Sequence, residues 1–267
     1  MILQQDTRIL WNRAIGSSYF HMGLRCGEGF ENAVPGQFVT LRIPDQQTPL
    51  LRRPFSIHRL VRENDSIRGI EILYRVVGNC TGRLSRLSAG DRVSLLGPLG
   101  NGFSVPGDGP IYMAAGGIGV APMVFLAESI HKKSPESSPH TLFLGGRTQT
   151  DLLCMDIFRS LGMALEVSTD DGSVGYEGLV TDLLQQAVLD NPPERIVACG
   201  PMPMLKTVAR IARSRQVPCE VSIETLMACG MGVCLGCAVE DRRPADKYRH
   251  VCIDGPVFEA ATLLMDS

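Results

Sequence analysis

The sequence predicts a β plus α/β fold: an antiparallel β-barrel, then a doubly wound parallel sheet, then a small C-terminal segment that is rich in cysteine. Residues 1 to about 104 hold many short apolar runs punctuated by Gly and Pro, which is typical of a small barrel. From Pro110 onwards, strand-like runs alternate with helical patterns, as in βαβ units. Four of the nine cysteines follow residue 228. We therefore divide the chain into residues 1–106, 107–222 and 223–267.

Composition excludes several classes of protein. The 26 Lys and Arg residues nearly balance the 28 Asp and Glu residues, and the net charge of −2 gives no electrostatic footprint for nucleic acid. The N-terminus lacks the unbroken apolar run of a signal peptide, and no segment approaches the ~20 apolar residues of a membrane span. We expect a cytoplasmic protein without a membrane anchor, whose cysteines hold metal or stay reduced.

In the first part, residues 34–43 and 69–77 have the alternation of barrel strands, and residues 78–87 read as a loop that opens a short helix. The first-turn N–H groups of that helix would face an anion. Arg53 to Ser56 combine a fork-shaped donor, a proline with fixed φ, an aromatic ring and a hydroxyl, a set suited to holding a pyrophosphate beside a planar ring. For Arg75 the residues alone leave a binding role and a solvated role equally open.

In the second part, residues 111–115 form a short apolar run, as expected of a strand buried on both faces. Further strands are expected at 141–144, 164–168 and 195–198, and helices follow residue 122 and cover about 151–161, 178–189 and 202–215. Gly116, Gly117 and Gly119 follow the first strand and predict a phosphate-binding turn, although Pro122 stands where the usual fingerprint has its third glycine. Cys199 and Gly200 end a later strand and would meet the same sheet edge, unless Cys199 is simply a small core residue.

The third part contains the pattern C-x4-C-x2-C, formed by Cys229, Cys234 and Cys237, and one distant cysteine, Cys252. This spacing is that of plant-type 2Fe-2S ligation. Interleaved glycines would let the loop adopt positive φ and bring N–H groups close to the sulfurs. Zinc is the alternative, but its structural sites usually present two C-x2-C pairs, so the spacing favours iron and sulfur.

Taken together, residues 53–56, 97–100, 116–119 and 199–204 and the cysteine set resemble the electron transfer subunits of class 1B dihydroorotate dehydrogenases, in the ferredoxin-NADP reductase superfamily. The resemblance covers nearly the whole chain. It implies an FAD-binding barrel at 1–106, an NAD-binding domain at 107–222 and a 2Fe-2S segment at 223–267. It also implies an FMN-containing catalytic subunit as partner, in a heterotetramer of two plus two chains.

The resemblance also implies roles for single residues. Arg53 would bind the FAD phosphates, and Ser56 would lie near the reactive edge of the flavin. Cys80 stands where the family has glycine before a threonine, so its contact is an open question. The full implied set is Arg53, Pro54, Phe55, Ser56, Leu73, Tyr74, Arg75, Cys80 and Thr81 for FAD; Gly116, Gly117, Gly119, Cys199 and Gly200 for NAD, with Cys199 near the nicotinamide; and Cys229, Cys234, Cys237 and Cys252 for the cluster.

The expected function follows from what each cofactor carries. A nicotinamide exchanges a hydride, a 2Fe-2S cluster accepts one electron at a time, and a flavin can do both, so FAD must lie between them. Electrons would pass from the partner's FMN through the cluster and FAD to NAD+, in pyrimidine (UMP) biosynthesis. The alternatives are a related reductase subunit that serves a glutamate-synthase-like or sulfide-metabolising flavoprotein, and a zinc-stabilised nucleotide-binding regulator. Arg147 could meet a 2′-phosphate, which leaves NADP open, although the resemblance favours NAD.

Overall fold

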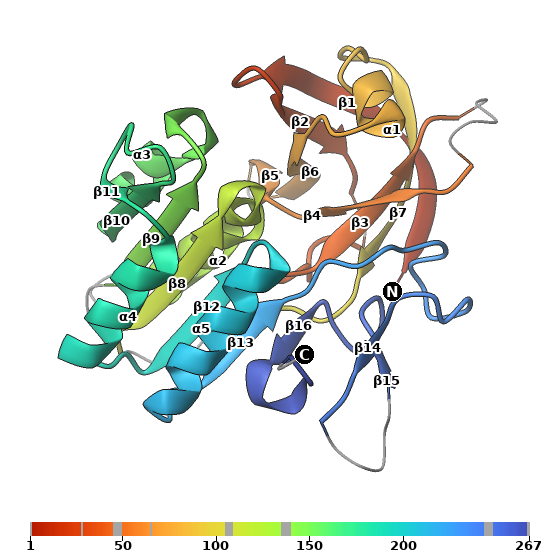
Figure 1. Ribbon diagram of the computed structural model, residues 1–267. Helices are drawn as coiled ribbons and strands as arrows, with labels where there is room; N and C mark the ends of the chain where they lie inside the picture. The colour runs from red at the N-terminus through yellow and green to blue at the C-terminus, as the bar shows by residue number, and fades with distance from the viewer. Residues whose placement is uncertain are drawn as a thin grey trace.

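The computed structural model describes residues 2–27, 29–44, 50–64, 66–104, 109–134, 140–242 and 248–265. Two seven-stranded sheets form two lobes, and the C-terminal segment packs beside both of them (Figure 1). The predicted fold class is confirmed. The predicted boundary at residues 106 and 107 lies outside the described residues. Within the described ranges, every helix is too short or too polar to cross a membrane.

The first sheet is antiparallel and curves back on itself. Its strands run in the order β4-β3-β7-β1-β2-β6-β5. β4 and β5 stand at opposite edges of the sheet but are joined by only two residues, Ile57 and His58, and the His58 N–H donates to the Glu71 carbonyl in β6 at 2.8 Å. This short link brings the two edges together. The strands are β1 (Leu3–Ala14), β2 (Tyr19–Arg25), β3 (Phe38–Arg42), β4 (Arg53–Ser56), β5 (Arg59–Glu63), β6 (Ser66–Arg75) and β7 (Arg92–Leu99).

The interior of this sheet is filled by alternate side chains of its strands. In β6, Ile70, Ile72 and Tyr74 are buried on one side, as the period of two requires. The short helix α1 (Asn79–Leu84) follows β6, and its Leu84 is buried in the same core. The loop and short helix expected at 78–87 are therefore found, and they close one end of the sheet.

The second sheet is doubly wound, with the order β11-β10-β9-β8-β12-β13-β16. Helices α4 and α5 pack on one face, and α2 and α3 pack on the other. The strand order reverses at β8, whose neighbours β9 and β12 carry the chain outward in opposite directions. Its elements are β8 (Ile111–Gly116), α2 (Ala121–Lys133), β9 (Thr141–Gly146), α3 (Met155–Ser160), β10 (Ala164–Thr169), β11 (Tyr176–Glu177), α4 (Val180–Asp190), β12 (Arg195–Cys199), α5 (Met202–Ser214) and β13 (Cys219–Ser222), with 3-10 turns at Gly117–Val120 and Gln149–Asp151.

One helix differs from the sequence prediction. The helix expected at about 151–161 is shorter, because Cys154 has a left-handed backbone (φ 65°) that separates the 3-10 turn from α3. The C-terminal segment adds a strand to the second sheet. Its strand β16 (Val257–Glu259) pairs antiparallel with β13, while β14 (Ala238–Glu240) and β15 (Tyr248–His250) form a small hairpin sheet and the 3-10 turn Ala260–Thr262 follows β16.

Candidate functional site

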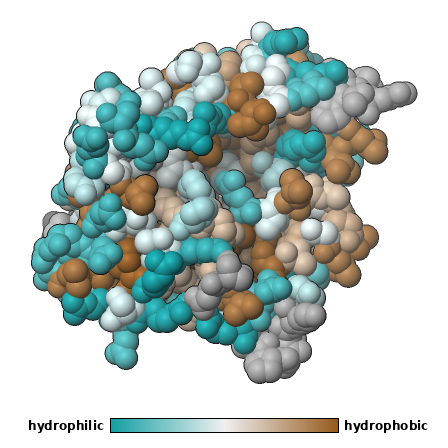
Figure 2. Space-filling model, viewed as in Figure 1, coloured by the Kyte–Doolittle hydropathy of each residue, from teal (hydrophilic) through white to brown (hydrophobic). Residues whose placement is uncertain are grey.

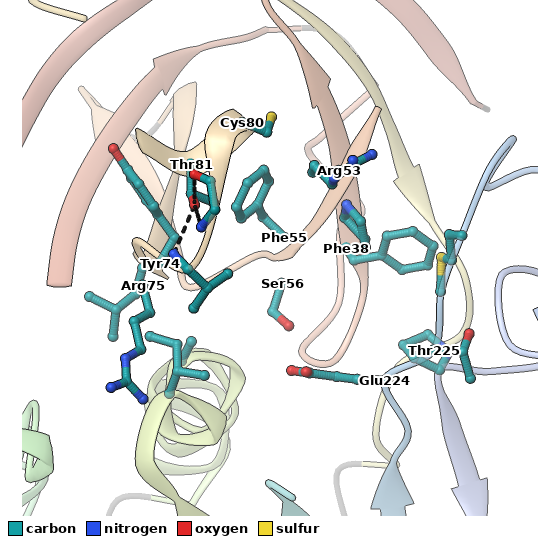
Figure 3. Close-up of a pocket in the computed structure, with 18 of the residues that line it drawn as sticks. Phe38, Arg53, Phe55, Ser56, Tyr74, Arg75, Cys80, Thr81, Glu224 and Thr225 are labelled. Atoms are coloured by element: carbon teal, nitrogen blue, oxygen red, sulfur yellow. Dashed lines mark hydrogen bonds between the residues drawn. The ribbon is translucent and has the colours of Figure 1, made fainter. Parts of the chain in front are cut away.

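A cavity of about 520 Å³ opens where the two lobes and the C-terminal segment meet. Its walls come from β3, β4, β6 and α1 of the barrel, from Ile118 and Ala121 after β8, and from the end of β13 with residues 223–225 and 227 that follow it. Figure 3 shows the barrel side chains on one side and Glu224 and Thr225 on the other. All the residues predicted for FAD line this one cavity: Arg53, Pro54, Phe55, Ser56, Leu73, Tyr74, Arg75, Cys80 and Thr81.

The barrel wall of the cavity is aromatic. The Phe55 and Tyr74 rings meet edge to face with centroids 5.8 Å apart, and the Phe20 ring stacks on the Tyr74 ring with centroids 5.6 Å apart. The Tyr74 hydroxyl donates to the Asn12 side chain at 3.1 Å, and burial raises the pKa of Tyr74 to about 12. Since these contacts fix the rings, they offer a rigid, flat apolar surface to a planar ligand.

Polar groups frame this surface. Arg53 donates from Nη1 to the backbone carbonyls of Leu51 and Arg52, at 3.1 and 3.2 Å, and its guanidinium lies on the same side of the cavity as the Cys80 sulfur (Figure 3). Burial raises the pKa of the Cys80 thiol, so the thiol is neutral and leaves the guanidinium as the charged group there. A guanidinium on a cavity wall suits an anionic ligand group such as a phosphate.

The turn before α1 is held by Thr81. Its hydroxyl oxygen accepts hydrogen bonds from the N–H groups of Val77 and Gly78, at 3.0 and 3.2 Å. The hydroxyl thus shapes the loop that lines the cavity. The residues predicted to meet phosphates, Cys80 and Thr81, lie in the first turn of this short helix.

Sequence analysis missed the wall that follows β13. Thr225 Oγ1 is buried without a hydrogen-bond partner among the described residues, so a polar atom of a ligand would satisfy it. Glu224 points toward Ser56 across the cavity (Figure 3). The Glu224 side chain is exposed to the cavity. The protein atoms that surround it displace water from the carboxyl, and this desolvation raises the pKa of Glu224. No local pattern marked these residues, because only the fold brings them to the barrel.

The predicted glycines lie at the carboxyl end of β8, where the strand order reverses. Ligands of open α/β sheets bind at such a switch point. Gly117 has φ +53° and faces open space, whereas a side chain at Gly119 would collide with the Cys199 carbonyl. A side chain at Gly200 would approach the backbone N of Gly116 at 3.0 Å. The glycines therefore let the turns after β8 and β12 pack closely and leave space in front of Gly117.

Two further predicted residues lie near this edge. Cys199 is 1% exposed in the core beneath it, where burial raises its pKa, and its contact with a nicotinamide stays a prediction. Arg147 is exposed just after β9, and its N–H donates to the Asp151 carboxylate at 3.0 Å. The exposed position leaves the guanidinium accessible at the same sheet edge.

The cysteine loop places its sulfurs in two pairs. The Cys234 thiol hydrogen bonds to the Cys229 sulfur, and the Cys237 and Cys252 sulfurs are 3.3 Å apart. Gly232 N–H points at Cys252 Sγ at 3.1 Å, and Gly230 and Gly232 have the left-handed conformation expected of this loop (φ 73° and 81°). Two thiolates for each of two irons is the requirement of a 2Fe-2S centre.

Backbone donors also prepare this loop for thiolates. Met231 N–H and Cys234 N–H each donate to Cys229 Sγ at 3.4 Å. Burial opposes ionisation, but these donors prevail and lower the pKa of Cys229 to about 6. Since the thiolate is the metal-binding form, the loop favours metal binding at neutral pH.

The outer surface of the loop is apolar. Leu226 is 92% and Val233 76% exposed, and Leu235 and Met231 are exposed next to them. Figure 2 shows hydrophobic residues at the right of the molecule, where the loop lies in Figure 1. Contiguous exposed apolar residues on a monomer mark an interaction surface.

The two lobes and the cavity between them define a ferredoxin-NADP reductase-like oxidoreductase. A solved NADH-dependent reduced ferredoxin-NADP oxidoreductase, described for flavin-based electron bifurcation, aligns with TM-score 0.83 and 27% identity over 97% of this chain and 90% of that one. A ferredoxin NADP+ reductase from Neisseria gonorrhoeae shares the fold, with TM-score 0.66 and 17% identity over 79% and 91% of the two chains.

The chain belongs to the family of dihydroorotate dehydrogenase B (NAD(+)) electron transfer subunits, as its sequence predicts. It is 36% identical to the protein of that name from Desulforamulus reducens over 95% of both chains, and 36% identical to that from Caldanaerobacter subterraneus subsp. tengcongensis over 98% of both. Residues 224–264 match the iron-sulfur cluster binding domain of dihydroorotate dehydrogenase B, and residues 113–210 match the oxidoreductase NAD-binding domain. The iron-sulfur match favours a cluster over zinc at the cysteines.

Proposed function

We propose that this chain transfers electrons between NAD(H) and an FMN-containing catalytic subunit that oxidises dihydroorotate, in the pyrimidine pathway to UMP. The observation that carries the proposal is the cavity bounded by all three parts of the chain. One wall belongs to the barrel, one to the glycine turn after β8, and one to the segment that leads into the cysteine loop. A redox cofactor in this cavity would adjoin both of the other sites.

The proposed occupant of the cavity is FAD. The residues that would hold it are Arg53 at the phosphates, the Phe55 and Tyr74 rings along the flavin, and Ser56 near its reactive edge, with Pro54, Leu73, Arg75, Cys80 and Thr81 completing the wall. When bound, a flavin exchanges a hydride with a nicotinamide and single electrons with an iron-sulfur cluster. Thr225 Oγ1, which has no partner among the described residues, supplies a further polar contact opposite the barrel.

NAD is proposed to lie at the carboxyl end of β8. Gly116, Gly117 and Gly119 form the turn there, and Gly200 packs against it from β12. The space in front of Gly117 suits a phosphate. Gly117 begins the 3-10 turn that leads into α2, and the backbone N–H groups at the start of such a turn attract an anion. The buried Cys199 would support the nicotinamide end from below.

The cluster is proposed to be held by Cys229, Cys234, Cys237 and Cys252. The sulfurs of Cys229 and Cys252 already accept hydrogen bonds from backbone N–H groups. Such donors stabilise the thiolates and tune the potential of a bound centre. The apolar residues around the loop would face the catalytic partner, in a heterotetramer of two plus two chains. We place this assembly in the cytoplasm, where free thiols stay reduced.

The test uses the chain purified without oxygen, alone and with its FMN-containing partner. Alone, it should show flavin and iron-sulfur absorption and reduce an artificial acceptor with NADH, without oxidising dihydroorotate. Adding the partner should restore dihydroorotate oxidation coupled to NAD+ reduction. Dihydroorotate oxidation by the lone chain would contradict the division of labour, and a colourless chain would remove the redox function altogether.

A second function is favoured by the structural alignment over 97% of the chain with the ferredoxin-NADP oxidoreductase. In that case the partner would be a different flavoprotein, and the apolar face would bind it instead. A pull-down from native extract, with flavin type and iron content measured for each band, separates the two. Recovery of an FMN barrel subunit supports the first proposal.

A further inference from the structure

Three side chains with metal-ligating atoms meet at the junction of the two lobes, away from the cysteine loop. They are His21 in β2, His58 in the link between β4 and β5, and Glu71 in β6, and each offers one ligand atom within 4.8 Å of the other two. Strand β6 and the link that carries His58 lie beside α2 at the centre of the molecule (Figure 1). The proposed redox function uses none of the three.

Strand register brings His21 and Glu71 together. Gly23 lies opposite Glu71 in the β2–β6 pair, and His21 is two residues away on β2, so the two side chains are diagonal neighbours on one face. His21 Nε2 is 2.7 Å from Glu71 Oε2. Because Gly23 has no side chain, the Trp11 ring packs against it. The centroids of the Trp11 and His21 rings are 6.0 Å apart.

His58 is oriented as a metal ligand would be. It is 2% exposed, and its Nδ1 is 2.7 Å from the Ala121 carbonyl oxygen. A carbonyl can only accept, so Nδ1 carries the hydrogen and Nε2 presents a lone pair. Burial lowers the pKa of His58 to about 4, which keeps the ring neutral. Metal-ligating histidines are held in this way, by a hydrogen bond from the second ring nitrogen.

The charges around the group also suit a cation. Burial opposes ionisation of Glu71, but its hydrogen bond with His21 lowers its pKa, so the carboxylate is charged. The cation nearby, Arg59, is paired with Glu128 of α2. The thiol of Cys154, which also faces Glu71, is kept neutral by burial, with its pKa raised to about 12. One carboxylate oxygen and two imidazole rings thus face one another within 4.8 Å.

We propose that His21, His58 and Glu71 form a binding site for a divalent transition-metal ion, with zinc as its occupant. Two imidazole nitrogens and one carboxylate oxygen are a ligand set that zinc accepts, with water in the fourth position. The ion replaces the hydrogen that His21 Nε2 donates to Glu71, and that proton moves to Nδ1 or to solvent. The Nε2 to Oε2 distance opens to about 3.4 Å, given tetrahedral geometry and bonds near 2.1 Å.

Such an ion ties β2 and β6 to the start of α2, because His58 is already fastened to Ala121. It would fix the barrel lobe against the nucleotide lobe. The site does not depend on the proposed electron transfer: zinc at these residues is measured without NADH, and either proposal can fail while the other holds.

The experiment compares zinc retained by the flavin- and iron-loaded chain after dialysis against low micromolar zinc. Variants His21→Gln and Glu71→Gln keep the size of each side chain, and His131→Gln, exposed in α2, is the matched control. Wild type and control should hold about one zinc ion per chain beyond any at the cysteines. His21→Gln and Glu71→Gln should each bind that zinc ion at least about tenfold more weakly.

Two further readouts locate the ion. Anomalous diffraction at the zinc edge should place it between the three side chains, and zinc should raise the melting temperature of wild type but not of Glu71→Gln. Equal zinc in wild type and both variants, or none in wild type beyond the cysteines, overturns the proposal. Unfolded variants do not obscure the result, because the diffraction experiment uses the wild-type chain.

Discussion

The Tyr19 hydroxyl donates a hydrogen bond to Asp151 Oδ1 at 2.6 Å, across the junction of the two lobes. Tyr19 belongs to β2 of the barrel, and Asp151 follows β9 of the second sheet. The Arg75 guanidinium lies over the Tyr19 ring at 5.5 Å, so this contact reaches the wall of the cavity. Burial and the Asp151 carboxylate raise the pKa of Tyr19 to about 12, and the hydroxyl keeps its proton.

Replacing Tyr19 with Phe should lower the free energy of unfolding by about 1–3 kcal/mol, because a buried carboxylate loses a donor. Chemical denaturation measures the change. Tyr176→Phe, at an exposed tyrosine of β11, is the matched control and should be nearly neutral. Equal effects of the two substitutions would show that the contact between lobes carries no stability.

The same contact predicts a dependence on pH. Burial raises the pKa of Asp151, but the Tyr19 hydroxyl and the Arg147 N–H outweigh it and hold the pKa below its ordinary value of 3.8. A carboxyl with a depressed pKa in the folded state stabilises the fold above its unfolded pKa, and this stability is lost as pH falls through the folded pKa. The difference between wild type and Tyr19→Phe should be full at neutral pH and shrink below pH 3.8. A difference that stays constant into strong acid would contradict this assignment.

Arg53→Ala should weaken FAD binding by about 10- to 100-fold, since a hydrogen bond to a charged group contributes about 1.5–3 kcal/mol. Flavin retained after gel filtration and the dissociation constant for added FAD measure the effect. Arg62→Ala, at an exposed arginine of β5, has the same change of charge away from the cavity. If both variants retain FAD as wild type does, Arg53 does not bind its phosphates.

Cys252→Ser should reduce iron from about two atoms per chain to nearly none and remove the visible absorption of the cluster. FAD should remain bound, because Cys252 does not line the cavity. Cys26→Ser, in the barrel core, controls for the loss of a buried thiol. Full iron content in Cys252→Ser would exclude this residue as a ligand.

Gly117→Ala and Gly119→Ala should have different main effects, one on NADH binding and the other on stability. At Gly119 a methyl group collides with the Cys199 carbonyl, and the overpacking should cost about 3 kcal/mol of stability. At Gly117 the space is open, so the positive φ costs only about 1 kcal/mol. There the methyl group enters the proposed phosphate position and should raise KM for NADH about tenfold, or 1.4 kcal/mol. An unchanged KM in Gly117→Ala would move the phosphate away from this turn.

The sequence was most informative where chemistry is local. The spacing of Cys229, Cys234 and Cys237, and the run from Arg53 to Ser56, each lie within a few residues, and each set is found together in the structure. The alternation of apolar runs and helices likewise predicted the second sheet, because its parallel strands are buried on both faces.

The sequence was silent where the fold joins distant segments. Glu224 and Thr225 reach the cavity only because β13 ends beside the barrel, and His21 and Glu71 become neighbours only through strand register. The alternation of side chains along a strand predicts which face of the sheet a residue lies on. It does not predict which strand lies beside it. Cys154 shortened a predicted helix by its left-handed backbone, which no local pattern indicates.

Strand β16 has a further consequence for the outer rim of the second sheet. By pairing with Glu220, Val221 and Ser222, it covers backbone groups of β13 that would otherwise be unpaired. Uncovered strand rims recruit strands from other molecules and lead to aggregation. A chain that ends after Cys252 would keep all four cluster cysteines but would lack β16, and it should aggregate more readily. Strand β16 therefore helps to keep the protein from self-association.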